Sequence, residues 1–82
     1  MKVHIRISPI AGFCEQRQEI EVVLKHGSKS EVETLLYNKL GVNPFNMEAI
    51  MFLLNGRGLE PREDVVFQDG DQLWLLPQLS GG

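Results

Sequence analysis

The chain has 82 residues, of which 43% are hydrophobic, and this fits one small globular domain with a single core. Its formal net charge is −3 and its eight Lys and Arg residues are scattered, which argues against nucleic-acid binding. No apolar run reaches the roughly 18 residues of a membrane span, and the alternating start is unlike a signal peptide, so we expect a cytoplasmic protein.

The first 25 residues predict a β-hairpin. The stretch KVHIRIS alternates polar and apolar residues, which indicates a half-buried strand that ends before Pro9. The stretch QEIEVVLK alternates in the same way, and the loop IAGFCEQR joins the two. The residues expected to face the core are Val3, Ile5, Ile7, Ile20, Val22 and Leu24.

The stretch GSKSEVETLLYNKLG changes to helical periodicity. Its apolar stripe consists of Val32, Leu35, Leu36 and Leu40. Two capping boxes are possible at the start, Ser28 with Glu31 or Ser30 with Glu33. Gly41 stands where a left-handed residue would end the helix.

Two further strands follow the helix. In EAIMFLLNG the apolar residues fall on both faces, and Asn55-Gly56 marks a turn. The stretch LEPREDVVFQDGDQ is expected to be a loop, with its sharpest turn at Asp69-Gly70-Asp71. The last strand, QLWLL, is expected to stop at Pro77.

This order of elements predicts an α+β fold of the β-grasp type, with a mixed four- to five-stranded sheet and one main helix on one face. The domain would span residues 1–76, with a flexible Gly-Gly tail at 77–82. If the core residues face the helix, then Leu53, Trp74 and Leu76 point outward from adjacent strands. Clustered exposed apolar side chains are typical of protein-binding surfaces, so we predict a partner interface there.

The chain finishes LPQLSGG. Glycine has no side chain, so a narrow channel in another protein could approach the backbone closely. Leu79, Ser80 and Gly81 would thread into such a channel, and the Gly82 carboxylate would be the reacting group. Extended from Pro77, the tail could reach about 20 Å.

The element order, Asn55-Gly56, the DGD turn at residues 69–71 and the ending LPQLSGG resemble the MoaD and ThiS family of ubiquitin-like sulfur carriers, and Pro77 favours a MoaD-like protein. The resemblance implies a protein cosubstrate rather than an enzyme, with no metal and no bound cofactor. A ubiquitin-activating-like adenylating enzyme would use ATP to adenylate Gly82, and a sulfur donor would convert it to a thiocarboxylate. A synthase subunit would accept the sulfur, and the pathway that the resemblance favours is biosynthesis of a molybdopterin or tungsten-pterin cofactor.

Two other functions remain open from the sequence. The chain could be a ubiquitin-like modifier that is joined to target lysines through Gly82, or a β-grasp binding module in which the two final glycines are incidental. Cys14 has no visible base as a partner and is expected to be structural or incidental. The acidic stretch of the 60–71 segment is expected to be a solvated loop face.

Overall fold

The computed structural model describes residues 1–78 of the chain. One α-helix, one short 3-10 helix and five strands make up this part of the protein. In chain order they are β1 (Lys2–Ile7), β2 (Gln18–Val23), α1 (Lys29–Leu40), η1 (Pro44–Asn46), β3 (Ile50–Leu54), β4 (Arg57–Leu59) and β5 (Gln72–Pro77). The residues predicted to form the threading tail, Leu79 to Gly82, lie outside the described part.

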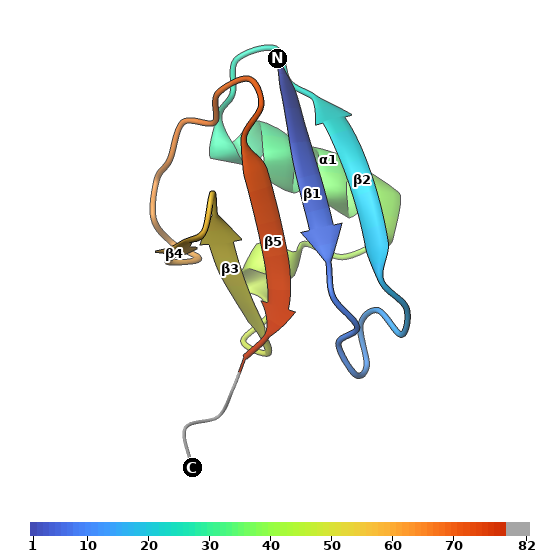
Figure 1. The fold of residues 1–82 in the computed structure, drawn as a ribbon. Helices are drawn as coiled ribbons and strands as arrows, with labels where there is room; N and C mark the ends of the chain where they lie inside the picture. Colours follow the sequence, from blue (N-terminus) through green and yellow to red (C-terminus); the bar gives the residue numbers. More distant parts are fainter. Residues whose placement is uncertain (79–82) are drawn as a thin grey trace.

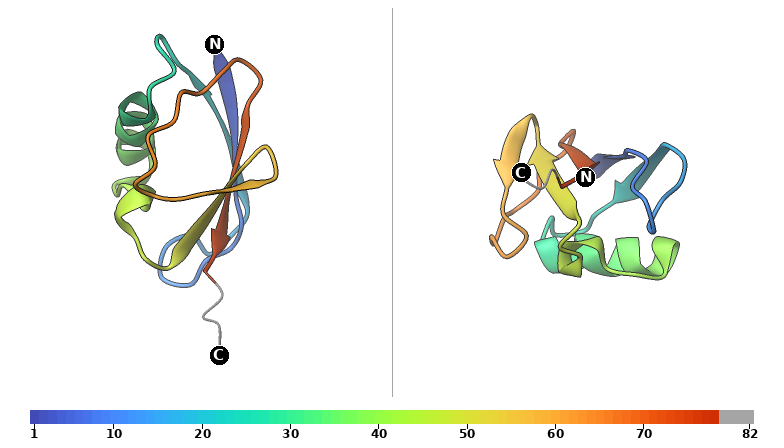
Figure 2. Two further views of the ribbon diagram at one scale, coloured as in Figure 1. Left: turned by 90° about the vertical axis from the view of Figure 1, so that its left-hand side faces the viewer. Right: turned by 90° about the horizontal axis from the view of Figure 1, so that it is seen from below.

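The five strands form one mixed sheet in the order β2-β1-β5-β3-β4, with β5 at its centre. β1 and β5 run parallel, and the other neighbouring pairs run antiparallel. Helix α1 crosses one face of the sheet, which Figure 2 shows edge-on, while Figure 1 looks onto the opposite face with α1 behind it. The predicted fold class is therefore confirmed, and one sheet face is left without a covering element in residues 1–78.

The first hairpin forms as predicted, with β1 and β2 paired from Lys2↔Val23 to Ile7↔Gln18. Its long connection folds back on the core, because Ile10 and Cys14 form an isolated bridge and are both buried. The Cys14 thiol donates a hydrogen bond of 2.8 Å to the carbonyl oxygen of Gln16. Cys14 therefore serves as a small core residue that fastens this loop.

The start of α1 uses the first of the two predicted caps. Ser28 is the N-cap, and its hydroxyl accepts a hydrogen bond from the Glu31 backbone N–H. The Glu31 carboxylate does not close the usual capping box but accepts from the backbone N–H groups of Lys25, His26 and Gly27. These bonds, led by the one from Lys25, stabilise the ionised form and lower the pKa of Glu31.

Two glycines are required by the backbone around α1. Gly41 ends the helix in the predicted left-handed conformation, with φ of 80°, and its N–H donates to the carbonyl oxygen of Tyr37. Gly27 has φ of +75°, and a Cβ there would collide with the backbone oxygen of Phe67. The Phe67 N–H donates a 2.7 Å hydrogen bond to the Gly27 carbonyl, which explains this close approach.

The short edge strand β4 (Arg57–Leu59) was not predicted, and the predicted loop is wrong only at its first residue, because Leu59 belongs to this strand. Asn55 and Gly56 both have positive φ, 52° and 84°, which suits the two-residue hairpin turn that joins β3 to β4. A strand of three residues is too short to show alternation in the sequence. The last strand also includes Pro77, one residue more than predicted.

The core lies between the sheet and α1. The predicted core residues of the first hairpin are buried, although Ile20 is only half-buried, and Leu59 on β4 joins the core without having been predicted. The rings of Phe45 and Phe52 stack with their centroids 4.4 Å apart and join η1 to β3. Phe67, in the long segment before β5, is fully buried and closes the core near the start of α1. This core fixes which side of β5 and β3 faces outward.

Candidate functional site

Four apolar side chains gather on the uncovered face of the sheet. Leu53 on β3 stands directly opposite Trp74 on β5, and Met51 stands directly opposite Leu76 in the same ladder. Trp74 is 38% exposed, and the other three are half-buried. We call Met51, Leu53, Trp74 and Leu76 the apolar patch. Such a cluster on a sheet face is typical of a protein-binding surface.

The outward placement of Leu53, Trp74 and Leu76 agrees with the prediction, as does their position on adjacent strands. Their role in docking stays a prediction. Met51 was not included in the predicted interface, although the alternation of β3 places it beside Leu53. Only the pairing of β3 with β5 reveals that Met51 faces Leu76, and strand pairing is not visible in a single sequence.

The indole of Trp74 is held in one orientation by two contacts from β1 and its end. Its Nε1–H donates a 3.0 Å hydrogen bond to the Ser8 hydroxyl. The Arg6 guanidinium lies over the ring, with Cζ 5.6 Å from the ring centroid, which is within cation–π range. Arg6 and Trp74 are register partners on the parallel pair β1 and β5. An aromatic anchor that is fixed before binding loses little freedom when a partner docks.

The other half of the uncovered face is charged and pairs with itself. On β1 and β2, Lys2 lies 3.7 Å from Glu21, and both Arg6 and His4 approach Glu19, at 3.3 and 3.8 Å. All of these side chains are about half exposed, so solvent screens the pairs and each contributes little to stability. The face is therefore divided into an apolar half on β5 and β3 and an ion-paired half on β1 and β2.

The root of the tail is tied to the sheet. Pro77 pairs with Ile50 in the β3–β5 ladder, and the Gln78 N–H donates a 2.8 Å hydrogen bond to the Ala49 carbonyl oxygen. The chain thus leaves the described sheet after Gln78 rather than at Pro77. Four residues remain beyond it, which could reach about 14 Å at most, less than the 20 Å expected from the sequence.

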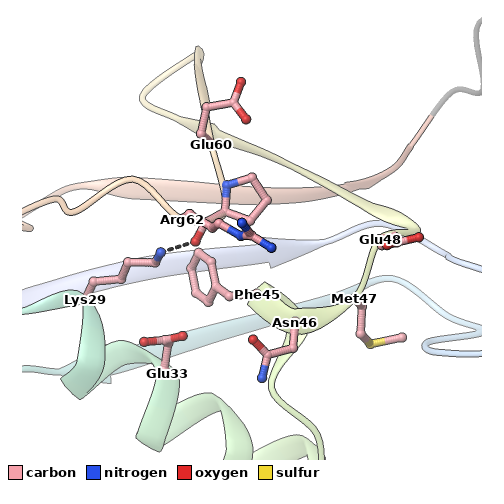
Figure 3. Close-up of a pocket in the computed structure, with 9 residues that line it drawn as sticks. Lys29, Glu33, Phe45, Asn46, Met47, Glu48, Glu60 and Arg62 are labelled. Atoms are coloured by element: carbon pink, nitrogen blue, oxygen red, sulfur yellow. Dashed lines mark hydrogen bonds between the residues drawn. The ribbon is translucent and has the colours of Figure 1, made fainter.

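A groove lies on the helix side of the sheet, between α1, η1 and the segment after β4 (Figure 3). This groove measures about 610 Å³ and is lined by side chains of both charges, including Lys29, Glu33 and Glu60. The Lys29 ammonium donates to the Pro61 carbonyl oxygen and lies 5.0 Å from the centroid of the Phe45 ring. Lys29 therefore fastens the segment after β4 to the helix.

The acidic stretch that precedes β5 has a structural use. Asp69 accepts a 2.7 Å hydrogen bond from the Lys2 N–H, and Asp71 accepts bonds from the Asn55 side chain and the Gln68 N–H. Within residues 1–78, no group of three or more His, Cys, Asp and Glu side chains is placed to hold a metal ion. No helix of the described part is long and apolar enough to cross a membrane.

Comparisons with known proteins bear on the fold. No protein-family model matches the chain, and no curated protein sequence matches it. Among solved structures, a chain from the protein–protein complex of subunits 1 and 2 of the molybdopterin-converting factor from Helicobacter pylori 26695 aligns over 100% of both chains, with a TM-score of 0.64 and 24% identity. SAMP1 from Haloferax volcanii also aligns over 100% of both chains, with a TM-score of 0.68 and 18% identity.

The chain has the ubiquitin-like β-grasp fold. A ubiquitin-like protein from the archaeon Caldiarchaeum subterraneum agrees, aligning over 99% of this chain and 100% of its own with a TM-score of 0.51 and 20% identity. The resemblance to ubiquitin-like carriers inferred from the sequence is thus confirmed at the level of the fold. At these identities the likeness of this β-grasp protein to its structural neighbours is one of architecture.

Proposed function

We propose that this β-grasp protein is a sulfur carrier, a protein cosubstrate whose Gly82 carboxylate is adenylated by a partner enzyme and converted to a thiocarboxylate. The observation that carries the proposal is the course of β5. This central strand presents Trp74 and Leu76 on the uncovered face, is tied to the sheet up to Gln78, and leads within four residues to Gly81-Gly82. A carrier that presents its tail to a partner needs a surface for docking and a tail that ends in residues without side chains.

The proposed chemistry divides the work between two proteins. A carboxylate oxygen of Gly82 attacks the α-phosphorus of ATP held by the partner, and pyrophosphate leaves. Sulfur at the oxidation level of sulfide then attacks the acyl carbon, and AMP leaves to give the thiocarboxylate. The partner holds the nucleotide, so this chain needs no phosphate-binding loop. The thiocarboxylate sulfur then passes to an acceptor, for which we favour a molybdopterin or tungsten-pterin precursor bound by a synthase subunit.

The apolar patch is the proposed contact with both partners. The structural neighbour from Helicobacter pylori was solved as a complex of two subunits, which supports a docking role for this fold. With the root fixed at Gln78, the partner's reactive centre must lie within about 14 Å of the end of β5. A partner that sits on Trp74 and Leu76 meets this condition, because Leu76 immediately precedes Pro77 at the end of the strand.

The test is adenylation of tail variants by the purified adenylating enzyme of the native host, followed by mass spectrometry. Adding one residue after Gly82 should abolish the AMP adduct, because the reacting carboxylate is displaced. Gly81→Val should block the reaction more strongly than Ser80→Ala, because a β-branched side chain widens the backbone and restricts its dihedral angles. An adduct that still forms on the extended chain would exclude the proposal.

A second candidate function is conjugation to lysines as a ubiquitin-like modifier. The likeness to a protein described as ubiquitin-like, from Caldiarchaeum subterraneum, favours keeping it, and it needs the same activated Gly82. The two functions differ in their products. Isopeptide adducts between Gly82 and target lysines would support the modifier, and a sulfur-containing Gly82 would support the carrier. A binding module with incidental glycines would show neither product.

A further inference from the structure

A small hollow opens on the uncovered face at the end of the sheet where β5 begins. It measures about 230 Å³ and is formed between β1, β3 and β5 and the turn after β3. The lining residues that matter here are two potential cations, two apolar side chains and two amides: His4, Arg6, Leu53, Trp74, Asn55 and Gln72. The hollow therefore borders the apolar patch on one side and the charged half of the face on the other.

The charge of this hollow differs from that of the rest of the protein. The chain has a net charge of −3, and the helix-side groove is lined by three glutamates, yet the described residues that line the hollow include no carboxylate. Two acids outside the lining bond its members: Asp71 accepts from the Asn55 side-chain amide at 2.9 Å, and Glu19 on β2 accepts from the Nε–H of Arg6 at 3.3 Å. The hollow is thus a basic and apolar site on an acidic protein.

Arg6 has hydrogen-bonding capacity to spare. A guanidinium carries five N–H donors in a fixed plane, and only the Nε–H of Arg6 bonds a described residue. The four donors on its terminal nitrogens make no hydrogen bond within residues 1–78. The group is held over the Trp74 ring and is about half exposed, so it is oriented and still reachable. Planar guanidinium donors match the two oxygens of a carboxylate.

We propose that this hollow receives a partner side chain that ends in a carboxylate, which rests its apolar stem on Leu53 and Trp74 and binds the terminal N–H groups of Arg6. The inference rests on the proposed docking role of the uncovered face and adds a requirement on the partner's chemistry. The six residues of β5 run from Gln72, beside the hollow, to Pro77, and the five steps between them span about 17 Å of strand. The partner must place an acidic side chain about that far from the entrance that takes the tail.

The test uses the full chain and three probes that share one phenylethyl group: 3-phenylpropionate, 3-phenylpropionamide and 2-phenylethylamine. Nuclear magnetic resonance follows the indole N–H of Trp74, the only tryptophan in the chain. The carboxylate should bind roughly twofold to fivefold more tightly than the amide at low salt, the gain of an exposed charge pair, and the amine should bind most weakly. High salt should remove the preference.

Two variants of β1 separate the hollow from the general charge of the face. Arg6→Gln should abolish the preference for carboxylate over amide while leaving a well-dispersed spectrum. Lys2→Gln removes the same charge from the same face and strand but lies outside the lining, so the preference should persist.

Equal binding of the carboxylate and the amide to the wild type would overturn the proposal, as would an equal loss of preference in both variants. Neither result would touch the tail chemistry, which is measured separately by adenylation of Gly82. Conversely, if the chain prefers the carboxylate but is never adenylated, the proposal for the hollow would stand and the proposed sulfur-carrier function would be excluded.

Discussion

Leu75 and Leu76 offer a matched test of the two faces of the sheet. They are consecutive on β5, but Leu75 is fully buried in the core, whereas Leu76 is half-buried on the uncovered face. Leu75→Ala should leave an enclosed cavity and cost about 2–5 kcal/mol of unfolding free energy. Leu76→Ala removes the same atoms without enclosing a cavity. Its cost should stay below the roughly 2.4 kcal/mol expected for three fully buried carbon groups.

Leu75→Ala should therefore be the less stable variant, and each 1 kcal/mol between the two corresponds to a difference of about 4–8 °C in melting temperature for a domain of this size. Circular dichroism during thermal and urea denaturation measures both values. The order of the two variants is the decisive result. If Leu76→Ala destabilises the protein as much as Leu75→Ala, the uncovered face is not open in solution, and the apolar patch is part of a core.

Three further predictions follow from single positions. Gly27→Ala should lose at least about 1–2 kcal/mol of stability from its left-handed backbone alone, whereas Gly58→Ala, which has open space for a Cβ and no positive φ, should lose less in the same urea titration. The lowered pKa of Glu31 should stabilise the folded protein at pH values above the ordinary carboxyl pKa of about 4.3. This stability should disappear as the pH falls through the lowered pKa of the folded state. The free energy of unfolding of the wild type should thus exceed that of Glu31→Gln near neutral pH and converge with it in acid, as urea titrations at the two pH values would measure. Trp74→Ala should weaken binding of the adenylating partner at least about tenfold in calorimetric titration, and unchanged affinity would remove Trp74 from the interface.

The periodic elements were predictable because their signals are local. The alternation of polar and apolar residues predicted β1, β2, β3 and β5 and their two faces. The helix was predicted from its apolar stripe and from the capping residues at its two ends. Ser28 and Gly41 act through side-chain and backbone geometry within one turn of the chain, so sequence spacing is enough to find them.

What the sequence missed depends on contacts between distant segments. The strand β4 is recognisable only through its pairing with β3, and Met51 joins the apolar patch only because β3 pairs with β5. The charged half of the uncovered face and the hollow at Arg6 require β1 to lie beside β5, a parallel neighbour almost 70 residues away in the chain. The Gln78 N–H bond to the Ala49 carbonyl oxygen, which ties the chain to the sheet one residue beyond Pro77, also has no signature in the sequence.

The central claim is that Gly82 carries activated sulfur, and intact-protein mass spectrometry of the chain purified from its native host tests it most directly. The proposal predicts a species that is heavier by the replacement of one oxygen by sulfur, located at Gly82 by fragmentation, together with an AMP adduct when the adenylating enzyme and ATP are supplied. A chain that always carries an ordinary carboxylate at Gly82 under these conditions, or that continues beyond Gly82, would contradict it.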